Sequence, residues 1–285
     1  MSERSTYRAL LRKAEGALRE ASVPEPEADA RALLSACFSL SMADYLLKAD
    51  EPADEAAADR FEEWLRRRAA REPLQYITGC AWFDGEPFLV TPDVLIPRQD
   101  TEVLTAEVMR HYPPEAHAGR VLDLCTGSGC ILLTLLKHSC FAEGVGTDIS
   151  PAALAVAKRN AERLGVNARF AEGDLYGAVP GERFTVITAN PPYVTEEEYQ
   201  SLDEEVLREP KLALTAPHEG LSFYERITAG AKDHLLPGGR IFFEIGCTQR
   251  ESVFRLLADA GFTEITCAKD PSGLDRVVSA RKEEA

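Results

Sequence analysis

The sequence predicts an α/β protein in which a small N-terminal helical bundle and a β-hairpin precede an open seven-stranded sheet, mostly parallel with an antiparallel edge strand. Three observations predict this fold. After Thr101, short apolar runs typical of buried strands alternate with segments of helical periodicity. The last two strands are separated only by Asp270–Gly273, which is too short for a crossover, so they should pair antiparallel. Before residue 75, apolar residues recur at the helical spacing.

Residues 1–75 are predicted to form the helical bundle. From Tyr7 onward, apolar residues recur at the helical period, and Pro24 marks where the first helix ends. Shorter helices rich in alanine and leucine are expected over residues 28–38, 43–47 and 56–64.

Residues 76–100 are predicted to form a β-hairpin that links two domains. Asp84-Gly85 lies between aromatic and apolar runs, which is the sequence signal of a tight hairpin turn. Arg98 is expected to pair with Glu102 and thereby to anchor the hairpin to the following domain.

Residues 101–285 are predicted to form one α/β domain. Helices are expected to begin at Cys130, Pro151, Ser222 and Gln249. Because helical segments separate most of the strands, crossover connections should make those strands parallel. The seven strands are expected over residues 121–124, 145–147, 169–171, 184–189, 240–245, 263–267 and 276–279.

The composition is that of an ordinary globular protein, with 45% hydrophobic and 28% charged residues among 285. A formal net charge of −15 opposes a broad phosphate-binding surface, so direct nucleic-acid binding is not expected. The seven cysteines include no C-x-x-C pair, which indicates reduced thiols and neither disulfides nor a metal site. No apolar run approaches the length of a membrane span and Met1–Arg4 begins no signal peptide, so we expect a cytoplasmic protein.

The strand at residues 184–189 ends in an unusual loop: Asn190, Pro191, Pro192 and Tyr193. Asn190 offers one carbonyl acceptor, and the prolines lack N–H groups while leaving their carbonyls free. A planar NH2 group could therefore donate one hydrogen to Asn190 and one to the Pro191 carbonyl, with Tyr193 covering its flat face. Asn and Pro are also common turn residues, so a purely structural strand end stays open as the alternative.

A glycine-bearing turn follows the strand at residues 121–124 and leads into a helix: Cys125, Thr126, Gly127, Ser128 and Gly129. Glycines let the backbone approach a ligand closely, and the start of a helix adds exposed N–H groups. A dinucleotide fingerprint would require Gly or Ala three residues after Gly129, where this chain has Leu132.

Carboxylates end three successive strands: Asp123, Asp148 and Asp174. Asp123 could order the turn or hold an ammonium group through water, Asp148 stands where such sheets bind ribose hydroxyls, and Asp174 could accept from an adenine amine. Each acid could instead be a cap or turn residue. S-adenosylmethionine has a ribose, an adenine and an amino-acid end but no phosphates. It would therefore suit a pocket that contains acids and no P-loop lysine. A nitrogen held at Asn190 would attack its methyl group.

With these motifs, the sequence resembles the HemK/PrmC family of class I methyltransferases. The resemblance implies a Rossmann-like methyltransferase sheet. It also implies that the chain transfers a methyl group from S-adenosylmethionine to the glutamine side-chain amide in the Gly-Gly-Gln motif of peptide chain release factors. The matching motifs are Glu72–Gly79, Val94–Arg98 with Thr101-Glu102, Asp123–Gly129, Asn190–Tyr193, Gly220-Leu221 with Phe223-Tyr224, Glu244–Gly246 and Gly273–Val278.

The resemblance also implies roles for parts of the chain. Cys125–Gly129, Asp148 and the backbone near Leu175 would line the cofactor pocket, and Asn190–Tyr193 would hold the glutamine. The helical domain would grip the release factor, and we expect the chain to act as a monomer. Three positions depart from the family pattern, with Cys125 in place of Gly, Gln99 in place of Pro and Leu175 in place of an aromatic residue.

An amide nitrogen is a poor nucleophile because its lone pair is delocalised into the carbonyl. Accepting both of its hydrogens at Asn190 and Pro191 would return electron density to nitrogen, and no general base is assigned. One alternative is methylation of an exocyclic base nitrogen in DNA or RNA, held by the same loop, which predicts a basic channel. A second alternative is a non-catalytic adaptor that kept the fold.

Overall fold

The computed structural model describes residues 5–116 and 119–284, so the expectation drawn from Met1–Arg4 lies outside the described residues. The chain divides into two compact units. The first runs up to Cys80 and also contains Asp203–Arg208, and the second contains Ala81–Leu202 and everything from Glu209 onward. The sequence predicted contiguous domains with a first boundary at residue 75 and did not assign the 203–208 segment to the helical unit.

The first unit is helical, as its periodicity predicts. The hydroxyl of Thr6 caps the first helix by accepting from the backbone N–H of Ala9 at 3.2 Å. Leu18, Leu33 and Phe61 are completely buried in its core. Its helices are α1 (Tyr7–Glu20), α2 (Pro26–Phe38), α3 (Met42–Lys48), α4 (Glu55–Ala69) and α5 (Leu74–Thr78), of which α5 lies partly where the hairpin was expected to begin. No single helix among the described residues is long and apolar enough to cross a bilayer. Taken together, α2 and α3 have the length and apolar composition of a span, but the chain bends by 85° between them.

An ion-pair cluster holds the 203–208 segment within the helical unit. The carboxylate of Glu205 lies 2.6 Å from the guanidinium of Arg71 and 2.9 Å from that of Arg68. Arg68 is buried and also lies 2.7 Å from the carboxylate of Asp29 on α2. Desolvation opposes ionisation of Glu205, but the hydrogen bonds from Arg71 and Arg68 outweigh it and hold the pKa of Glu205 at about 2.

The second unit contains the seven-stranded sheet. Its strand order is β5-β4-β3-β6-β7-β9-β8. Strand β9 runs antiparallel to both β7 and β8, while the other pairings are parallel, which confirms the predicted mostly parallel sheet with an antiparallel edge pair. The strands are β3 (Arg120–Leu124), β4 (Glu143–Asp148), β5 (Arg169–Glu172), β6 (Phe184–Ala189), β7 (Leu235–Glu244), β8 (Thr263–Lys269) and β9 (Asp275–Arg281). A separate hairpin pairs β1 (Cys80–Phe83) with β2 (Glu86–Leu89).

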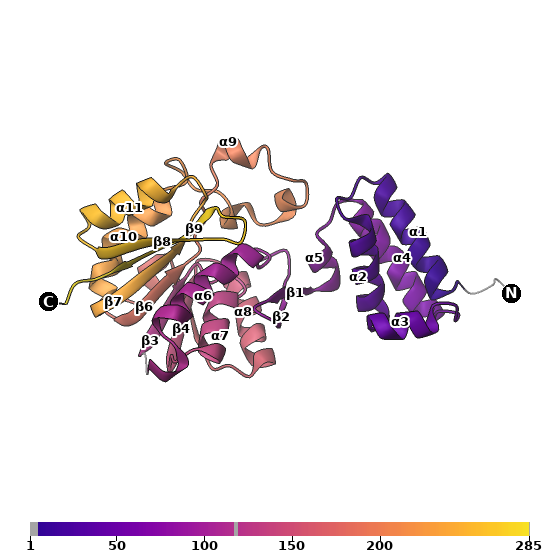
Figure 1. The fold of residues 1–285 in the computed structure, drawn as a ribbon, viewed down its shortest axis with the longest axis horizontal. Helices are drawn as coiled ribbons and strands as arrows, with labels where there is room; N and C mark the ends of the chain where they lie inside the picture. The colour runs from indigo at the N-terminus through magenta and orange to yellow at the C-terminus, as the bar shows by residue number, and fades with distance from the viewer. Residues whose placement is uncertain (1–4, 117–118, 285) are drawn as a thin grey trace. The chain divides into compact units, whose positions relative to one another are not determined.

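Helices cover both faces of this sheet, with α6, α7 and α8 on one side and α10 and α11 on the other (Figure 1). Strand β3 pairs with β4 on one side and β6 on the other, so the chain changes direction across the sheet at this pair. In open α/β sheets, a crevice for ligands forms beyond the carboxyl ends of such strands. The helices are α6 (Glu102–His111), α7 (Cys130–His138), α8 (Pro151–Leu164), α9 (Glu196–Tyr199), α10 (Ser222–His234) and α11 (Arg250–Asp259).

Candidate active site

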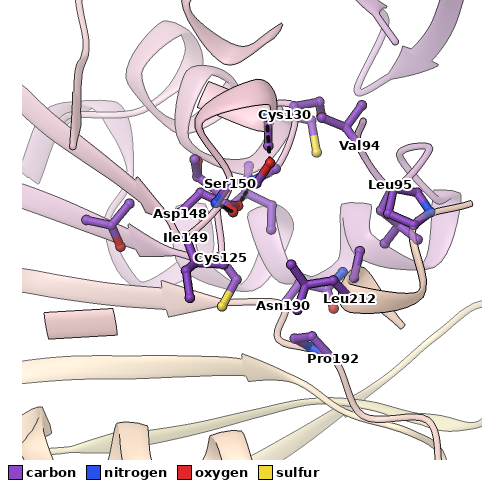
Figure 2. Close-up of a pocket in the computed structure, with 18 of the residues that line it drawn as sticks. Val94, Leu95, Cys125, Cys130, Asp148, Ile149, Ser150, Asn190, Pro192 and Leu212 are labelled. Atoms are coloured by element: carbon purple, nitrogen blue, oxygen red, sulfur yellow. Dashed lines mark hydrogen bonds between the residues drawn. The ribbon is translucent and has the colours of Figure 1, made fainter. Parts of the chain in front are cut away.

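A cavity opens beyond the carboxyl ends of β3, β4 and β6, and Figure 2 shows Cys125, Asp148, Asn190 and Pro192 around it. Apolar residues from other segments, including Val94, Leu95 and Leu212, complete its wall. Most of the predicted site residues line the cavity together: Cys125, Thr126, Gly127, Ser128, Asp148, Asp174, Leu175, Asn190 and Pro192. Four others are absent from the wall formed by the described residues: Asp123, Gly129, Pro191 and Tyr193.

The turn after β3 has a left-handed backbone at Cys125, Gly127 and Gly129. Cys125, Gly127 and Gly129 adopt φ angles of 57°, 54° and 80°. Cys125 therefore takes a conformation that favours glycine, at a cost on the order of 1–2 kcal/mol for a residue with a side chain. Gly129 is also sterically restricted, because an added Cβ would lie 3.2 Å from the Cβ of Ala157 on α8. The turn thus brings its backbone close to both the ligand cavity and the neighbouring helix.

Asp148 ties this turn to the end of β4. Its carboxylate accepts the backbone N–H groups of Gly127 and Ser150, each at 2.9 Å. Burial raises the pKa of Asp148, and these two hydrogen bonds oppose the rise. Because each carboxylate oxygen has two acceptor sites, Asp148 retains the capacity to accept hydroxyl hydrogens from a ligand in the cavity.

Asp123 is completely buried and orders the turn from behind. It accepts hydrogen bonds from the hydroxyls of Thr126 and Thr188, both at 2.7 Å. Desolvation raises the pKa of Asp123 to about 7, although both hydroxyls favour its ionised form. Its carboxylate therefore supports the cavity without forming part of its wall.

Two cations line the cavity among the described residues, and each is paired with a carboxylate. Arg226 lies 2.6 Å from Asp174, and Arg98 pairs with the buried carboxylate of Glu209. The expected pair of Arg98 and Glu102 is wrong, because Glu102 instead accepts the backbone N–H of Asp84 in the hairpin turn at 2.9 Å. A cavity lined by acids and by arginines that are already paired fits a ligand with a cationic centre and no phosphate. S-adenosylmethionine is such a ligand.

The cavity contains one aromatic residue, among those that the structure describes, that the sequence placed in a family motif without assigning it to the site. Leu175, where the family pattern has an aromatic residue, is buried and adopts a φ angle of 50°. Phe223 on α10 lines the same cavity, and the guanidinium of Arg226 lies 5.8 Å from the centre of its ring. Among the described residues that line the cavity, Phe223 supplies the aromatic ring. Its signal in the sequence was an aromatic residue beside Ser222, where a helix was expected to begin.

Asn190 lies at the end of β6, next to Pro192 and Leu212 on the cavity wall (Figure 2). Its amide nitrogen Nδ2 donates to the hydroxyl of Thr101 at 3.3 Å. Thr101 also lines the cavity and is otherwise buried. Because Nδ2 donates to Thr101, the acceptor atom Oδ1 of the same amide is available to accept a hydrogen from a ligand.

Tyr193 is fixed by several contacts beside this loop. Its backbone N–H donates to the carbonyl of Leu214 at 3.2 Å, and its hydroxyl lies 3.5 Å from the carboxylate of Glu244. Because the side chain of Tyr193 is absent from the cavity wall, its predicted role as a cover for a flat amide stays a prediction.

The sequence placed Thr101 and Glu244 in motifs that match the family but assigned neither of them to the site. Glu244 ends strand β7, and its carboxylate is buried beside the Asn190 loop. Desolvation raises the pKa of Glu244 to about 7, and the nearby polar and cationic side chains of Thr101 and Arg276 oppose the rise. A charged residue at the end of the buried run Ile241–Phe243 was the available signal, since such strand ends carry ligand-binding side chains in open α/β sheets.

Comparisons with known proteins show which family this chain resembles. A family model described as "PrmC N-terminal domain" matches residues 9–79, and one described as "Methyltransferase small domain" matches residues 99–219. The chain is 40% identical over 277 residues to a release factor glutamine methyltransferase of Geobacter sulfurreducens, covering 97% of this chain and 96% of that protein. It is 44% identical to the protein of the same name from Cereibacter sphaeroides, covering 95% and 96%.

Among solved structures, a methyltransferase from Pyrococcus furiosus superposes with a TM-score of 0.54 at 19% identity, covering 70% of this chain and 91% of that one. A 16S rRNA methyltransferase from T. thermophilus, solved with AdoMet and guanosine, gives a TM-score of 0.53 at 21% identity and covers 72% of this chain and 50% of that one. At these identities, the two structures support the fold alone.

Proposed function

Because this chain belongs to the family of release factor glutamine methyltransferases, we propose that it methylates the side-chain amide nitrogen of a glutamine in a peptide chain release factor, within the Gly-Gly-Gln motif. The observation that carries the proposal is that the residues expected to bind the cofactor and those expected to hold the amide line the same cavity. The turn at Cys125–Ser128 and Asp148 form one part of the wall, and Asn190 and Pro192 form another.

S-adenosylmethionine, when bound, supplies a methyl group on a cationic sulfur. Asp148 would accept hydrogens from its ribose hydroxyls, since this carboxylate lines the cavity and keeps free acceptor sites. Leu175 and Phe223 would provide apolar contact for its adenine. Because Arg98 and Arg226, the two cations among the described residues of the wall, are each paired with a carboxylate, neither would repel the sulfonium group.

Asn190 would hold the substrate amide by accepting one of its two hydrogens at Oδ1. The expected second acceptor is the backbone carbonyl of Pro191, which follows Asn190 in the chain but is absent from the wall formed by the described residues. Holding both hydrogens directs the nitrogen lone pair toward the methyl group. Orientation of this kind can contribute up to about 7–11 kcal/mol to lowering a barrier. The nitrogen becomes cationic and acidic as the methyl group arrives, so its proton can pass to water without a strong base.

The first unit would recognise the release factor, and its match to the PrmC N-terminal domain over residues 9–79 supports that assignment. We expect the chain to act as a monomer and in the cytoplasm, where translation factors act. Its net charge of −15 supports recognition of a protein and opposes direct binding of nucleic acid.

Transfer of a labelled methyl group tests this proposal. The full chain is incubated with tritiated S-adenosylmethionine and, in separate reactions, an intact release factor, the same factor with the Gly-Gly-Gln glutamine changed to alanine, and duplex DNA. Label should enter the intact factor only. Label in the DNA with none in the intact factor would replace this function with base methylation.

A further inference from the structure

Gln249 lies immediately before α11, and its side chain joins three segments near the site. Its amide nitrogen Nε2 donates to the backbone carbonyl of Tyr193 at 3.1 Å and to that of Glu219 at 3.4 Å. Its amide oxygen Oε1 accepts the backbone N–H of Gly246 at 3.0 Å. One side chain therefore connects the loop that follows β6, the turn before α10 and the end of β7.

This use of the side chain differs from the common one at a helix start. A residue there usually caps the helix by accepting a backbone N–H of the first turn, and Ser, Thr, Asp and Asn are preferred. Gln249 occupies the N-cap position of α11, but its side chain makes no capping hydrogen bond with the described residues of that helix. Both ends of its amide are directed at other segments, so helix capping does not account for this residue.

The three partners determine which way the Gln249 amide faces. The backbone N–H of Gly246 can only donate, so it requires the oxygen Oε1 on its side. The carbonyls of Tyr193 and Glu219 can only accept, so they require the nitrogen Nε2 on theirs. Because all three partners select one orientation, a residue of the same shape without the NH2 group would not make the same contacts.

The turn that carries Glu219 is packed against this hydrogen bond. His218, Glu219 and Gly220 have φ angles of 54°, 56° and 79°, in the left-handed region that disfavours the first two because they carry a side chain. Gly220 is buried. A Cβ added to it would lie 2.1 Å from the carbonyl oxygen of Tyr193 and 2.5 Å from Nε2 of Gln249. The backbone of the turn thus leaves just enough room for Gln249 to reach Tyr193.

The Asn190–Tyr193 loop is stiff enough to transmit the contact. The rings of its two prolines fix their φ angles, so these residues cannot absorb a shift by rotation about that bond. The backbone N–H of Tyr193 donates to the carbonyl of Leu214 at 3.2 Å, and the carbonyl of Tyr193 accepts from Gln249. Fixing Tyr193 on both sides therefore also restricts the position of Asn190.

We propose that Gln249 is a positioning residue that holds the Asn190–Tyr193 loop in place through the carbonyl of Tyr193. Gln249 is absent from the cavity wall formed by the described residues, so it acts on the substrate only through this loop. The inference rests on the proposed function in so far as Asn190 holds the substrate amide. It extends the site to the start of α11.

Two variants test which end of the Gln249 side chain matters. Gln249→Met keeps the length and loses all three hydrogen bonds, and it should lower kcat for methylation of the release factor about 10- to 100-fold, since small misplacements near a reacting centre have effects of that size. Gln249→Glu has nearly the same shape and keeps the acceptor for Gly246, but it sets an oxygen against the two carbonyls. Its kcat should be at least as low as that of Gln249→Met. A wild-type kcat in Gln249→Glu would overturn the proposal.

A split between catalysis and binding separates positioning from a folding defect. Turnover is expressed per S-adenosylmethionine-binding site, counted by calorimetry, so unfolded protein does not lower it. The KM for the release factor and the Kd for S-adenosylmethionine should each change less than about 3-fold, because the three hydrogen bonds of Gln249 given above reach neither the helical unit nor the turn at Cys125–Ser128. An unchanged kcat per binding site in Gln249→Met would overturn the proposal.

Thr263→Val is the matched control. Like Gln249→Met, it removes a hydrogen bond from a side chain to a backbone carbonyl, here from Thr263 to Arg281 at 3.3 Å. This bond joins β8 and β9 away from the carboxyl ends of the parallel strands, because Thr263 begins β8. The control should therefore leave kcat unchanged. A loss as large as that of Gln249→Met would assign both losses to general packing and overturn the proposal.

Hydrogen exchange gives a readout that requires no substrate. The backbone N–H groups of Tyr193 and Val194 donate to the carbonyl of Leu214, and that of Ala216 donates to the carbonyl of Val194. These amides should exchange at least about 10-fold faster in Gln249→Met, because the loop is released, while the control leaves them unchanged. Equal exchange overturns the proposal. If the wild type labels no release factor but exchange is faster in Gln249→Met, the proposed function alone fails.

Discussion

The hydroxyl of Thr188 on β6 donates to the carboxylate of Asp123 on β3 at 2.7 Å, across the pair of strands where the sheet topology reverses. Both residues are fully buried, and desolvation raises the pKa of Asp123 to about 7 from an ordinary value of 3.8. Between these two pH values, the folded chain keeps a proton that the unfolded chain has released. Asp123 therefore favours folding at acidic pH, and that contribution is lost as the pH rises through about 7.

We predict that Asp123→Asn flattens part of the pH dependence of stability. For the wild type, Asp123 contributes a fall of up to about 1.4 kcal/mol in the free energy of unfolding per pH unit between pH 4 and 7. Urea unfolding of both proteins at pH 5, 6 and 7 measures the difference between their slopes. Glu244 shifts in the same direction but is present in both proteins, so parallel slopes would mean that Asp123 is already ionised at pH 5.

Truncation of Asn190 should abolish most of the turnover. Asn190→Ala removes one of the two proposed acceptors for the substrate amide, and we expect kcat to fall by about 100-fold or more, as for other groups that act on the reacting centre. The affinity for S-adenosylmethionine should change less than about 3-fold, because Asp148 and the turn at Cys125–Ser128 are unaffected. Steady-state kinetics and calorimetry make the two measurements. Unchanged turnover would exclude this loop from the chemistry.

Asp148 is predicted to control cofactor affinity. Asp148→Ala removes the ribose acceptor and releases the backbone N–H groups of Gly127 and Ser150. We expect the Kd for S-adenosylmethionine to rise about 10- to 100-fold, which corresponds to a hydrogen-bonded charged group. Asp93→Asn is the control, because Asp93 lines the same cavity but bonds to the hydroxyl of Thr91, and it should bind normally. Equal losses in both variants would point to a general effect of charge.

Gly220 is predicted to tolerate no side chain, because its Cα lies close to the backbone of Tyr193. An added Cβ would lie 2.1 Å from the carbonyl oxygen of Tyr193, and the φ angle of Gly220 is 79°. Gly220→Ala should displace the Asn190–Tyr193 loop and lower kcat about 100-fold, since shifts near 1 Å at a site have effects of that size. Gly85→Ala has a similar φ angle of 78° with nothing within 4 Å and is the matched control for backbone strain alone. Similar kcat values for the two variants would contradict the steric argument.

Glu205 is predicted to stabilise the helical unit at neutral pH and to stop doing so in acid. Its pKa in the folded chain is about 2, below the ordinary 4.5, so its contribution is present above pH 4.5 and lost as the pH falls toward 2. Because Glu205 is partly solvated, we expect Glu205→Gln to lower the free energy of unfolding by about 2 kcal/mol at pH 7. Chemical unfolding at pH 7 and 3 should show this difference shrinking, and Glu204→Gln, at an exposed neighbour, should be neutral at both.

The local parts of the structure could be predicted from the sequence because each has its own periodic or turn signal. The alternation of strands and helices predicted the sheet, and Asp84-Gly85 predicted the hairpin turn. In the structure these two residues have φ angles of 48° and 78°. Helix α6 was missed although Leu104 and Val108 are spaced as on one helical face. Its position directly after the hairpin obscured that spacing.

What could not be predicted depends on residues that meet only after folding. Asn190 and Thr101 are 89 residues apart in the chain, and neither has a local pattern that indicates their hydrogen bond. The same is true of Arg71 and Glu205, which are 134 residues apart. Charged residues are common on solvated helix faces, so the run Arg66–Arg68 gave no sign that Arg68 would be buried.

The placement of Asp203–Arg208 in the helical unit has a consequence for biosynthesis. On the ribosome, residues 5–80 emerge first, yet the carboxylate that neutralises Arg68 and Arg71 is not translated until most of the sheet has been made. Until then Arg71 lacks the Glu205 carboxylate and Arg68 has only its contact with Asp29, so the final consolidation of the bundle follows elongation through the β6 loop. A gene truncated after codon 80 would therefore encode a bundle lacking one of its own structural pieces.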